Sequence, residues 1–355
     1  MTRPARVIFN PAAVRANLDL VHRAAPGARV LAIVKADAYG HGMVRVARAL
    51  GEVDALGVAS VEEAVRLREA GVVRPIVLLE GPFEASELAD IALHGLDSVV
   101  HNAEQQAWFE RQAVANVLWI KIDTGMHRLG FTPVAAQRAV LALQRPGREL
   151  RLMTHLASAQ VHGAASVTQQ LQTFLAAVEG LAGARCVANS SAILGWPPGS
   201  GEWVRPGLML YGVSPFEDTG ATSLGLQPAM TVTSALIAVK TVVAGGAVGY
   251  APGYVCPVDL PIGVVAFGYA DGYPRHAATG TPVLVNGVRT QVLGVATMDM
   301  LMVDLRPVPG ARVGDPVVLW GAGLPVEEIA RAAGTIPYEL LCRMPMRAPC
   351  VELSA

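Results

Sequence analysis

The sequence predicts an α/β fold: a (β/α)8 TIM-type barrel over residues 10–224, followed by a mostly antiparallel β domain over residues 225–355. Two observations predict it. Eight short apolar runs alternate with helix-period segments in the first part, and after about residue 225 short β-branched runs are broken by Gly and Pro. A chain of 355 residues is long enough for both parts.

The predicted barrel begins with a helix that Asn10 caps and Pro11 starts, and Gly27 follows its apolar run. A later helix has the capping-box pattern Ser60-x-x-Glu63 and ends at Gly71. Eight strands are predicted between such segments, at Val30–Lys35, Ala55–Ser60, Pro75–Glu80, Leu96–His101, Val117–Asp123, Leu150–His155, Arg185–Asn189 and Trp203–Arg205.

Polar residues stand at or near the ends of these apolar runs, where a barrel has its catalytic groups. They are Lys35, Glu80, His101, Lys121, Asp123, His155, Asn189 and Arg205. Any one of them is explained as an ordinary strand end, but the whole series indicates an active site at this end of the barrel.

The predicted β domain contains a hairpin, because Asn286-Gly287 between two branched runs is typical of a type I′ turn. A short helix is expected at Val326–Ala333. The strands are expected at Ala235–Val243, Ile262–Ala266, Thr281–Val285, Thr290–Val295, Met300–Leu305 and Pro316–Leu319.

Composition narrows the classes of partner and location. Hydrophobic residues make up 52% and charged residues 16%, which favours an oligomer that covers apolar surface. With 28 basic and 29 acidic side chains, neither nucleic acid nor an anionic membrane is an expected partner. The N-terminus lacks an export signal, so a cytoplasmic enzyme is expected, and the glycines and prolines of residues 241–258 rule out a membrane helix there.

The four cysteines, Cys186, Cys256, Cys342 and Cys350, are expected to be reduced and buried, and no metal site is predicted. The chain also lacks a Gly-x-x-x-x-Gly-Lys-Ser/Thr loop, a complete dinucleotide fingerprint, Gly-x-Ser-x-Gly and His-Glu-x-x-His. ATP and NAD are therefore disfavoured as ligands.

Lys35 ends the first apolar run and precedes Tyr39 and two glycines. A partly desolvated lysine at a barrel mouth has a lowered pKa, and its free amine is able to form a Schiff base with an aldehyde cofactor. The alternative is a surface lysine whose stem lies along apolar surface. Because lysine occurs only at Lys35, Lys121 and Lys240 in a chain that otherwise uses arginine, amine chemistry at chosen positions is favoured.

Two further clusters follow predicted strands. Lys121, Asp123 and Arg128 suit either a bound carboxylate or a structural network of ion pairs. Ser190 stands where barrels bind phosphate, with Gly207 as a source of a backbone amide, although Ser190 also fits an ordinary helix cap.

Five phrases, taken together and in order, resemble the alanine racemase family over nearly the whole chain. They are Val34–Gly42, Lys121–Gly130, Arg205–Gly212, Gly268–Arg275 and Met298–Met300. The resemblance implies a homodimer with shared active sites, a barrel that binds pyridoxal phosphate, and a β domain to which residues 1–9 add a strand. It further implies an isomerase that interconverts L- and D-alanine, with its role in supplying D-alanine for peptidoglycan or in degrading it left open.

The resemblance also implies a role for each motif. Lys35 binds the cofactor and is the base on the D-alanine side, and Tyr269 of the partner subunit is the base on the L-alanine side, oriented by His155 and Arg205. The other cofactor residues are Tyr39, His155, Asn189, Ser190, Gly207 and Leu208, with Arg205 at the pyridine nitrogen. Arg128 and Met298 bind the substrate carboxylate, Lys121 occupies a position that can be carbamylated, and Asp271 and Asp299 support the site.

Two departures from the family and three alternatives accompany this hypothesis. Met346 stands where many members have a tyrosine that reaches the phosphate, and Val295 where some have an entrance arginine. The alternatives are a racemase of broad specificity, a pyridoxal-phosphate decarboxylase of the same fold that would use Cys342, and a non-catalytic protein that binds the cofactor.

Overall fold

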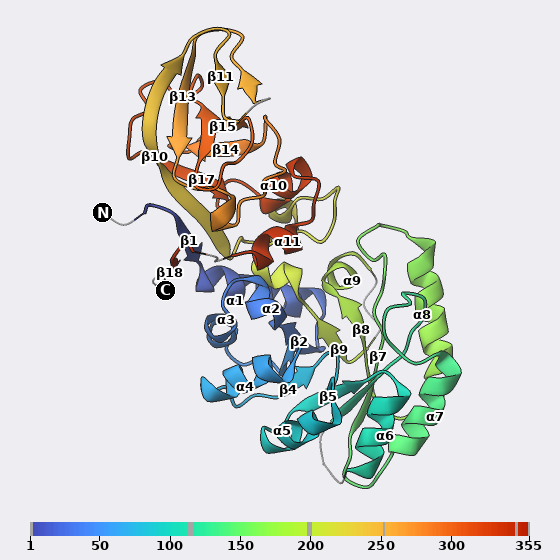
Figure 1. Cartoon of the computed structure of the whole chain (residues 1–355). Helices are drawn as coiled ribbons and strands as arrows, with labels where there is room; N and C mark the ends of the chain where they lie inside the picture. Colours follow the sequence, from blue (N-terminus) through green and yellow to red (C-terminus); the bar gives the residue numbers. More distant parts are fainter. Residues whose placement is uncertain (1–2, 113–116, 197–200, 251–252, 345–346, 354–355) are drawn as a thin grey trace.

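The computed structural model describes residues 3–112, 117–196, 201–250, 253–344 and 347–353, and its barrel lies beside a β sheet (Figure 1). The barrel is closed by parallel pairing of its last strand with its first. Its strands are β2 (Arg29–Ile33), β3 (Ala55–Val58), β4 (Ile76–Leu78), β5 (Asp97–Val100), β6 (Leu118–Lys121), β7 (Leu150–Met153), β8 (Ala184–Asn189) and β9 (Trp203–Arg205). The eight predicted barrel strands are confirmed.

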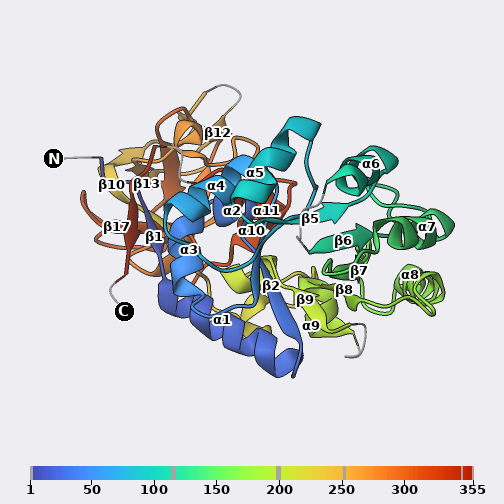
Figure 2. The same ribbon diagram turned by 90° about the horizontal axis from the view of Figure 1, so that it is seen from below.

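Helices surround the barrel on its outer face (Figure 2). They are α1 (Pro11–Ala24), α3 (Met43–Ala49), α4 (Val61–Glu69), α5 (Leu88–Leu93), α6 (Ala103–Arg111), α7 (Pro133–Leu143), α8 (Ala165–Ala177) and α9 (Ser190–Gly195), and α2 (Lys35–Tyr39) follows β2. Asn10 caps α1 through its side-chain oxygen, as predicted, because this oxygen accepts from the first free backbone N–H groups.

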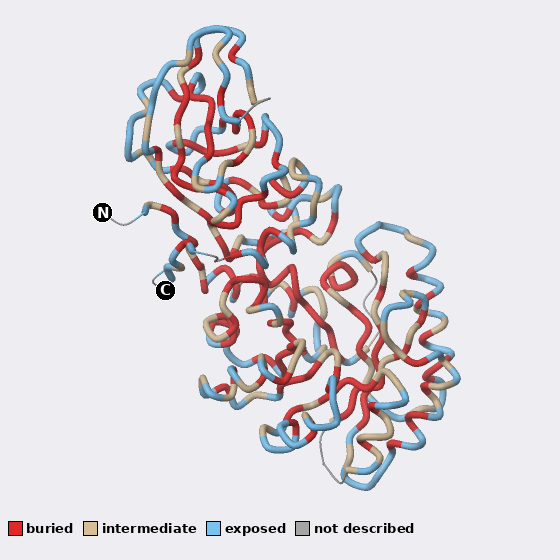
Figure 3. The backbone as a smooth tube through the Cα atoms, viewed as in Figure 1, coloured by how far each residue is buried: buried red, intermediate tan, exposed pale blue. Residues whose placement is uncertain are grey.

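The two ends of the barrel differ. Trp119 and Trp203 pack edge to face near the starts of their strands, and the Arg151 guanidinium lies over both rings at 4.8 and 4.4 Å. All three residues are buried, and most of the backbone of the barrel strands is coloured as buried (Figure 3). The carboxyl ends of the strands are left to build a site.

The β domain is an eight-stranded sheet with the order β13-β16-β15-β14-β17-β10-β1-β18. Its strands are β1 (Arg6–Phe9), β10 (Met230–Val242), β13 (Leu260–Val265), β14 (Pro282–Val285), β15 (Val288–Leu293), β16 (Leu301–Asp304), β17 (Pro316–Trp320) and β18 (Cys350–Glu352), and β11 (Ala247–Val248) pairs with β12 (Tyr254–Val255). β1 lies between β10 and β18, so the first and last described segments are neighbours (Figure 1). Asn286 and Gly287 both have positive φ in the β14–β15 hairpin, which confirms the predicted turn.

Helix α10 (Val326–Ala332) confirms the predicted helix, whereas α11 (Pro337–Cys342) was not predicted. The expectation of four buried thiols is wrong, because only Cys186 and Cys256 are buried. Cys342 is exposed on α11 and Cys350 is half-buried in the edge strand β18, positions where little packs over a side chain. No helix among the described residues is long and apolar enough to cross a membrane.

Candidate functional site

A cavity of about 720 Å³ opens at the carboxyl ends of the barrel strands. Its lining includes ten of the site residues predicted from the sequence: Lys35, Tyr39, Lys121, Arg128, His155, Asn189, Ser190, Arg205, Gly207 and Leu208. Side chains that follow different strands therefore converge on one space, as a barrel active site requires.

Lys35 enters this cavity from a strained turn. Ala36, Asp37, Ala38 and Tyr39 all have φ between 51° and 55°, so α2 is a short left-handed turn. For residues other than glycine this conformation costs roughly 1–2 kcal/mol each. Such strain persists only where surrounding contacts enforce it, and it is typical of functional sites.

Glu63 supplies part of that enforcement. The predicted capping box is wrong, because Ser60 accepts from the Glu63 N–H but the Glu63 carboxylate does not return to Ser60. Its oxygens instead accept from the N–H groups of Ala36 at 2.7 Å and Ala59 at 2.8 Å. The carboxylate therefore connects helix α4 to the turn that carries Lys35.

Four cationic side chains line the cavity: Lys35, Lys121, Arg128 and Arg205. One of them, Lys35, has Glu80 as an ion-pair partner. Lys35 Nζ lies 3.6 Å from Glu80 Oε1. Burial, followed by the charges of Arg205, Arg128 and Lys35, lowers the pKa of Lys121 to about 8. This excess of positive charge suits an anionic ligand and raises the fraction of neutral Lys121 amine.

Arg205 and His155 form a hydrogen-bonded pair. The buried guanidinium donates to Thr154 O at 2.6 Å, to Cys186 O at 2.8 Å and to His155 Nδ1 at 3.3 Å. Because arginine only donates, His155 Nδ1 is an acceptor and the ring proton is on Nε2. Burial, then the charge of Arg205, lowers the pKa of His155 to about 3, so the imidazole is neutral at ordinary pH.

Ser190 and Gly207 contact each other directly. Ser190 Oγ accepts from the N–H groups of Gly207 at 2.9 Å and Met209 at 3.3 Å, which leaves its hydroxyl hydrogen free to donate. A Cβ on Gly207 would stand 2.8 Å from Tyr39 Oη, so only glycine permits this approach. Asn189 caps α9 through Ala192 N–H, which accounts for its side chain structurally.

Asp123 shapes the loop that carries Arg128. Its Oδ1 accepts from the N–H groups of Gly125, Met126 and His127 at 3.0 to 3.1 Å. Arg128 follows this loop, is exposed, and lines the cavity. The carboxylate therefore organises the backbone here and does not line the large cavity itself.

Tyr269, Met298, Asp271 and Asp299 do not line the cavity of their own chain. Tyr269 and Met298 are 37% and 54% exposed on two adjoining turns of the β domain. Of the two departures, Val295 is half-buried near these turns, and Met346 lies outside the described residues.

Helix α11 contributes Tyr338, which the sequence did not reveal, and Cys342, which was named only for the decarboxylase alternative. Tyr338 and Cys342 line the cavity, and the Tyr338 ring lies 5.5 Å from that of Tyr39. Pro337 is a helix-start signal that could have located α11, but no local pattern indicates that this helix covers the barrel.

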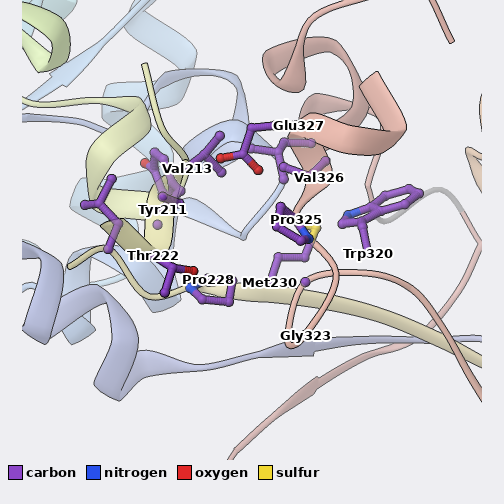
Figure 4. Close-up of a pocket in the computed structure, with 15 residues that line it drawn as sticks. Tyr211, Val213, Thr222, Pro228, Met230, Trp320, Gly323, Pro325, Val326 and Glu327 are labelled. Atoms are coloured by element: carbon purple, nitrogen blue, oxygen red, sulfur yellow. The ribbon is translucent and has the colours of Figure 1, made fainter. Parts of the chain in front are cut away.

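A second cavity, of about 170 Å³, lies between the barrel and α10 (Figure 4). Its lining is mostly apolar and includes Tyr211, Met230 and Trp320. Glu327 also lines it and accepts from Ser214 N–H at 2.8 Å, while burial raises the pKa of Glu327. This hydrogen bond joins the β domain to the barrel.

Comparisons with known proteins agree over the whole chain. Family models match residues 9–215 as the N-terminal domain and residues 229–352 as the C-terminal domain of alanine racemase. Alanine racemase of Nitrosospira multiformis is 49% identical over 353 residues, covering 98% of this chain and 99% of that protein. A protein named alanine racemase, catabolic, from Pseudomonas putida is 49% identical over 347 residues, covering 96% and 97%.

Solved structures show the same similarity. The crystal structure of the biosynthetic alanine racemase from Pseudomonas aeruginosa has a TM-score of 0.96 and 44% identity, covering 99% of this chain and all of that chain. The structure of the alanine racemase from Acinetobacter baumannii has a TM-score of 0.95 and 35% identity, and the match covers 99% of this chain and 100% of that chain.

Proposed function

The chain belongs to the alanine racemase family, and from this we propose that it interconverts L- and D-alanine with two bases, Lys35 and Tyr269 of the partner subunit. Membership of the family supports alanine racemisation, an isomerase reaction. The observation that carries the finer proposal is the placement of Lys35 in a cationic cavity whose lining, among the described residues, does not include Tyr269, which is exposed on its own chain.

We propose pyridoxal phosphate as the cofactor because the cavity suits its parts. Ser190 has a free hydroxyl hydrogen, and Tyr39 Oη faces the space that the missing Cβ of Gly207 leaves. Both suit the phosphate, with Leu208 and Asn189 beside it. Arg205, which only donates, would meet the pyridine nitrogen and keep it unprotonated. When bound, the cofactor supplies an aldehyde for the amino group and withdraws electrons from the α-carbon.

The protein's own groups then move one proton on each face of that carbon. Lys35 Nζ removes or returns the proton on the D-alanine face, and Tyr269 Oη does so on the L-alanine face. Neutral His155, fixed by Arg205, would orient Tyr269 through its Nε2–H. Arg128 and the Met298 backbone would hold the substrate carboxylate, which keeps the α-carbon between the two bases.

Because Tyr269 and Met298 are exposed and outside their own chain's cavity, we propose a homodimer in which each β domain completes the partner's site. We also propose residues 10–224 as the cofactor-binding barrel and residues 225–355, with 1–9, as the β domain. The pairing of β1 with β10 supports that division.

We further propose that Lys121 is carbamylated and that the resulting anion holds Arg128. The nearby cations and the lowered pKa of Lys121 favour reaction of its neutral amine with CO2. Proteins similar to this chain include one named catabolic and one named biosynthetic.

The test uses purified protein with pyridoxal phosphate and L-alanine in heavy water, following D-alanine formation and α-proton exchange together. Both should appear. Exchange without D-alanine would mean that only the base on the L-alanine face works, which contradicts the role of Lys35 on the D-alanine face. Decarboxylation would identify the alternative enzyme class, and a bound cofactor with no reaction would support the non-catalytic alternative. Tyr269→Phe should lose racemisation and keep the absorbance of the bound cofactor.

A further inference from the structure

The turn that carries Tyr269 is joined to the turn that carries Met298. Tyr269 N–H donates to Thr297 O and Ala270 N–H donates to Met298 O, each at 3.0 Å. The two backbones lie so close that a Cβ on Gly268 would stand 2.4 Å from Met298 O. The position of Tyr269 therefore depends on whatever holds this pair of turns.

The buried Asp271 carboxylate is the centre of that support. Its Oδ2 accepts from Gly268 N–H at 2.8 Å and from Arg3 at 2.7 Å, and its Oδ1 accepts from Arg347 Nε at 2.6 Å. Burial by itself would raise the pKa of Asp271, but the hydrogen bonds from Arg347, Gly268 and Arg3 outweigh it and lower this pKa. The carboxylate is therefore ionised and has partners on both oxygens at neutral pH.

The same two arginines reach the second turn. Arg3 donates to Asp299 O at 2.7 Å, and Arg347 forms an ion pair with the Asp299 carboxylate. Arg3 precedes β1 and Arg347 precedes β18, and these strands are parallel neighbours at one edge of the sheet. The pairing of the two strands thus brings two cations from distant parts of the sequence to one buried carboxylate.

We infer that Arg3 and Arg347 are positioning residues for Tyr269, acting through Asp271 and the Asp299 turn. The inference rests on the proposed role of Tyr269 as the base on the L-alanine face. Without the arginines Asp271 is a buried charge without its partners, so the turn must rearrange to solvate it. Lys35 is held by the barrel and its α2 turn, so proton transfer on the D-alanine face should continue.

The measurement is the fate of D-alanine in heavy water with the holoenzyme. After Lys35 removes the α-proton, a deuteron returns either on the same face, giving deuterated D-alanine, or on the opposite face, giving L-alanine. Proton NMR with chiral chromatography separates the two products. In Arg347→Met and Arg3→Met we expect the ratio of exchange with retention to racemisation to rise roughly ten- to a hundredfold, since a small misplacement of a reacting group has effects of this size.

Arg306→Met is the matched control. Arg306 is also half-exposed and pairs at 2.6 Å with a buried aspartate of the β domain, Asp304, but within the described part of the chain it forms no hydrogen bond or ion pair with the Tyr269 turn. In Arg306→Met the ratio of exchange with retention to racemisation should equal that of the unmodified protein. Arg347→Lys, which keeps the charge but not the forked geometry, should fall between Arg347→Met and the unmodified protein.

The outcomes separate the two hypotheses. An unmodified protein that forms no L-alanine overturns the proposed function. Racemisation by the unmodified protein, with an unchanged ratio in both arginine variants, overturns the positioning role alone. A parallel fall of exchange and racemisation in folded variants also overturns it, because the damage is then not confined to the L-alanine face. If Arg347→Met does not fold, Arg3→Met and Arg347→Lys provide the same comparison.

Discussion

Replacing Tyr39 by phenylalanine should weaken pyridoxal phosphate binding by roughly 10- to 150-fold. A hydrogen bond to a charged group contributes about 1.5–3 kcal/mol, and about 1.4 kcal/mol corresponds to a factor of ten. Burial, and next the nearby Tyr338 and Cys342, raise the pKa of Tyr39, so its hydroxyl is a neutral donor at any working pH. Phenylalanine removes that donor and keeps the ring packing.

Gly207→Ala should produce nearly the same loss by moving the hydroxyl. The new Cβ would stand 2.8 Å from Tyr39 Oη, and the ring has little freedom to move because Tyr211 and Tyr338 pack at 5.0 and 5.5 Å. In the Tyr39→Phe background the nearest ring atom is at 3.5 Å, an ordinary contact. The double variant should therefore bind about as well as Tyr39→Phe alone.

Titration of the apoenzyme with pyridoxal phosphate, followed by absorbance, gives the dissociation constant of the cofactor. It is measured for the unmodified protein, Tyr39→Phe, Gly207→Ala and the double variant. Tyr211→Phe is the control, because the Tyr211 hydroxyl donates to Ile33 O at 2.7 Å and Tyr211 does not line the cavity of about 720 Å³. It should cost about 1 kcal/mol of stability and leave the dissociation constant unchanged. Unchanged binding by Tyr39→Phe, or losses that multiply in the double variant, would refute the reasoning.

Three further predictions concern ionisable groups. Native mass spectrometry should show the mass of one added CO2 per chain, absent in Lys121→Ala; an unmodified mass in bicarbonate at pH 8 would contradict carbamylation. The pKa of His155 is lowered from 6.5 to about 3, so the unfolded chain binds a proton before the folded protein does as the pH falls. The free energy of unfolding should therefore decrease as the pH is lowered from 6.5 to about 3. Urea unfolding should show a smaller fall in His155→Gln, and parallel curves would sink the argument. Burial raises the pKa of Glu327, so its contribution to stability is lost as pH rises; Glu327→Gln should raise the melting temperature at pH 8 but not at pH 4, and an equal effect at both would exclude this cause.

The barrel could be predicted because its signals are local. A fully buried parallel strand requires a short apolar run, and the polar residue that follows marks the end where side chains converge. Lys35, Lys121, His155 and Arg205 were located by this rule alone. Their convergence on one cavity follows from closure of the barrel.

Other parts of the site depend on contacts between distant segments. The left-handed turn after Lys35 has no glycine to announce it, and Glu63 reaches Ala36 across 27 positions. Tyr338 lies over the cavity only because the β domain places α11 against the barrel. The sequence pattern also predicted the wrong partner for Glu63. A glutamate at this position is able either to close a capping box with Ser60 or to accept from a distant amide, and the pattern does not distinguish the two.

The two proposed bases are held by physically different means. Lys35 depends on a strained backbone turn, whose Ala36 N–H donates to Glu63 and whose Ala38 N–H donates to Val34 O. Tyr269 depends on an ion-paired carboxylate, Asp271, whose arginine partners are distant in sequence but come from one edge of the sheet. Because no residue of one support contacts the other in the described part of a single chain, each base should be open to perturbation alone. A two-base racemase built this way should reveal, in its ratio of exchange to inversion, which support a given substitution has damaged.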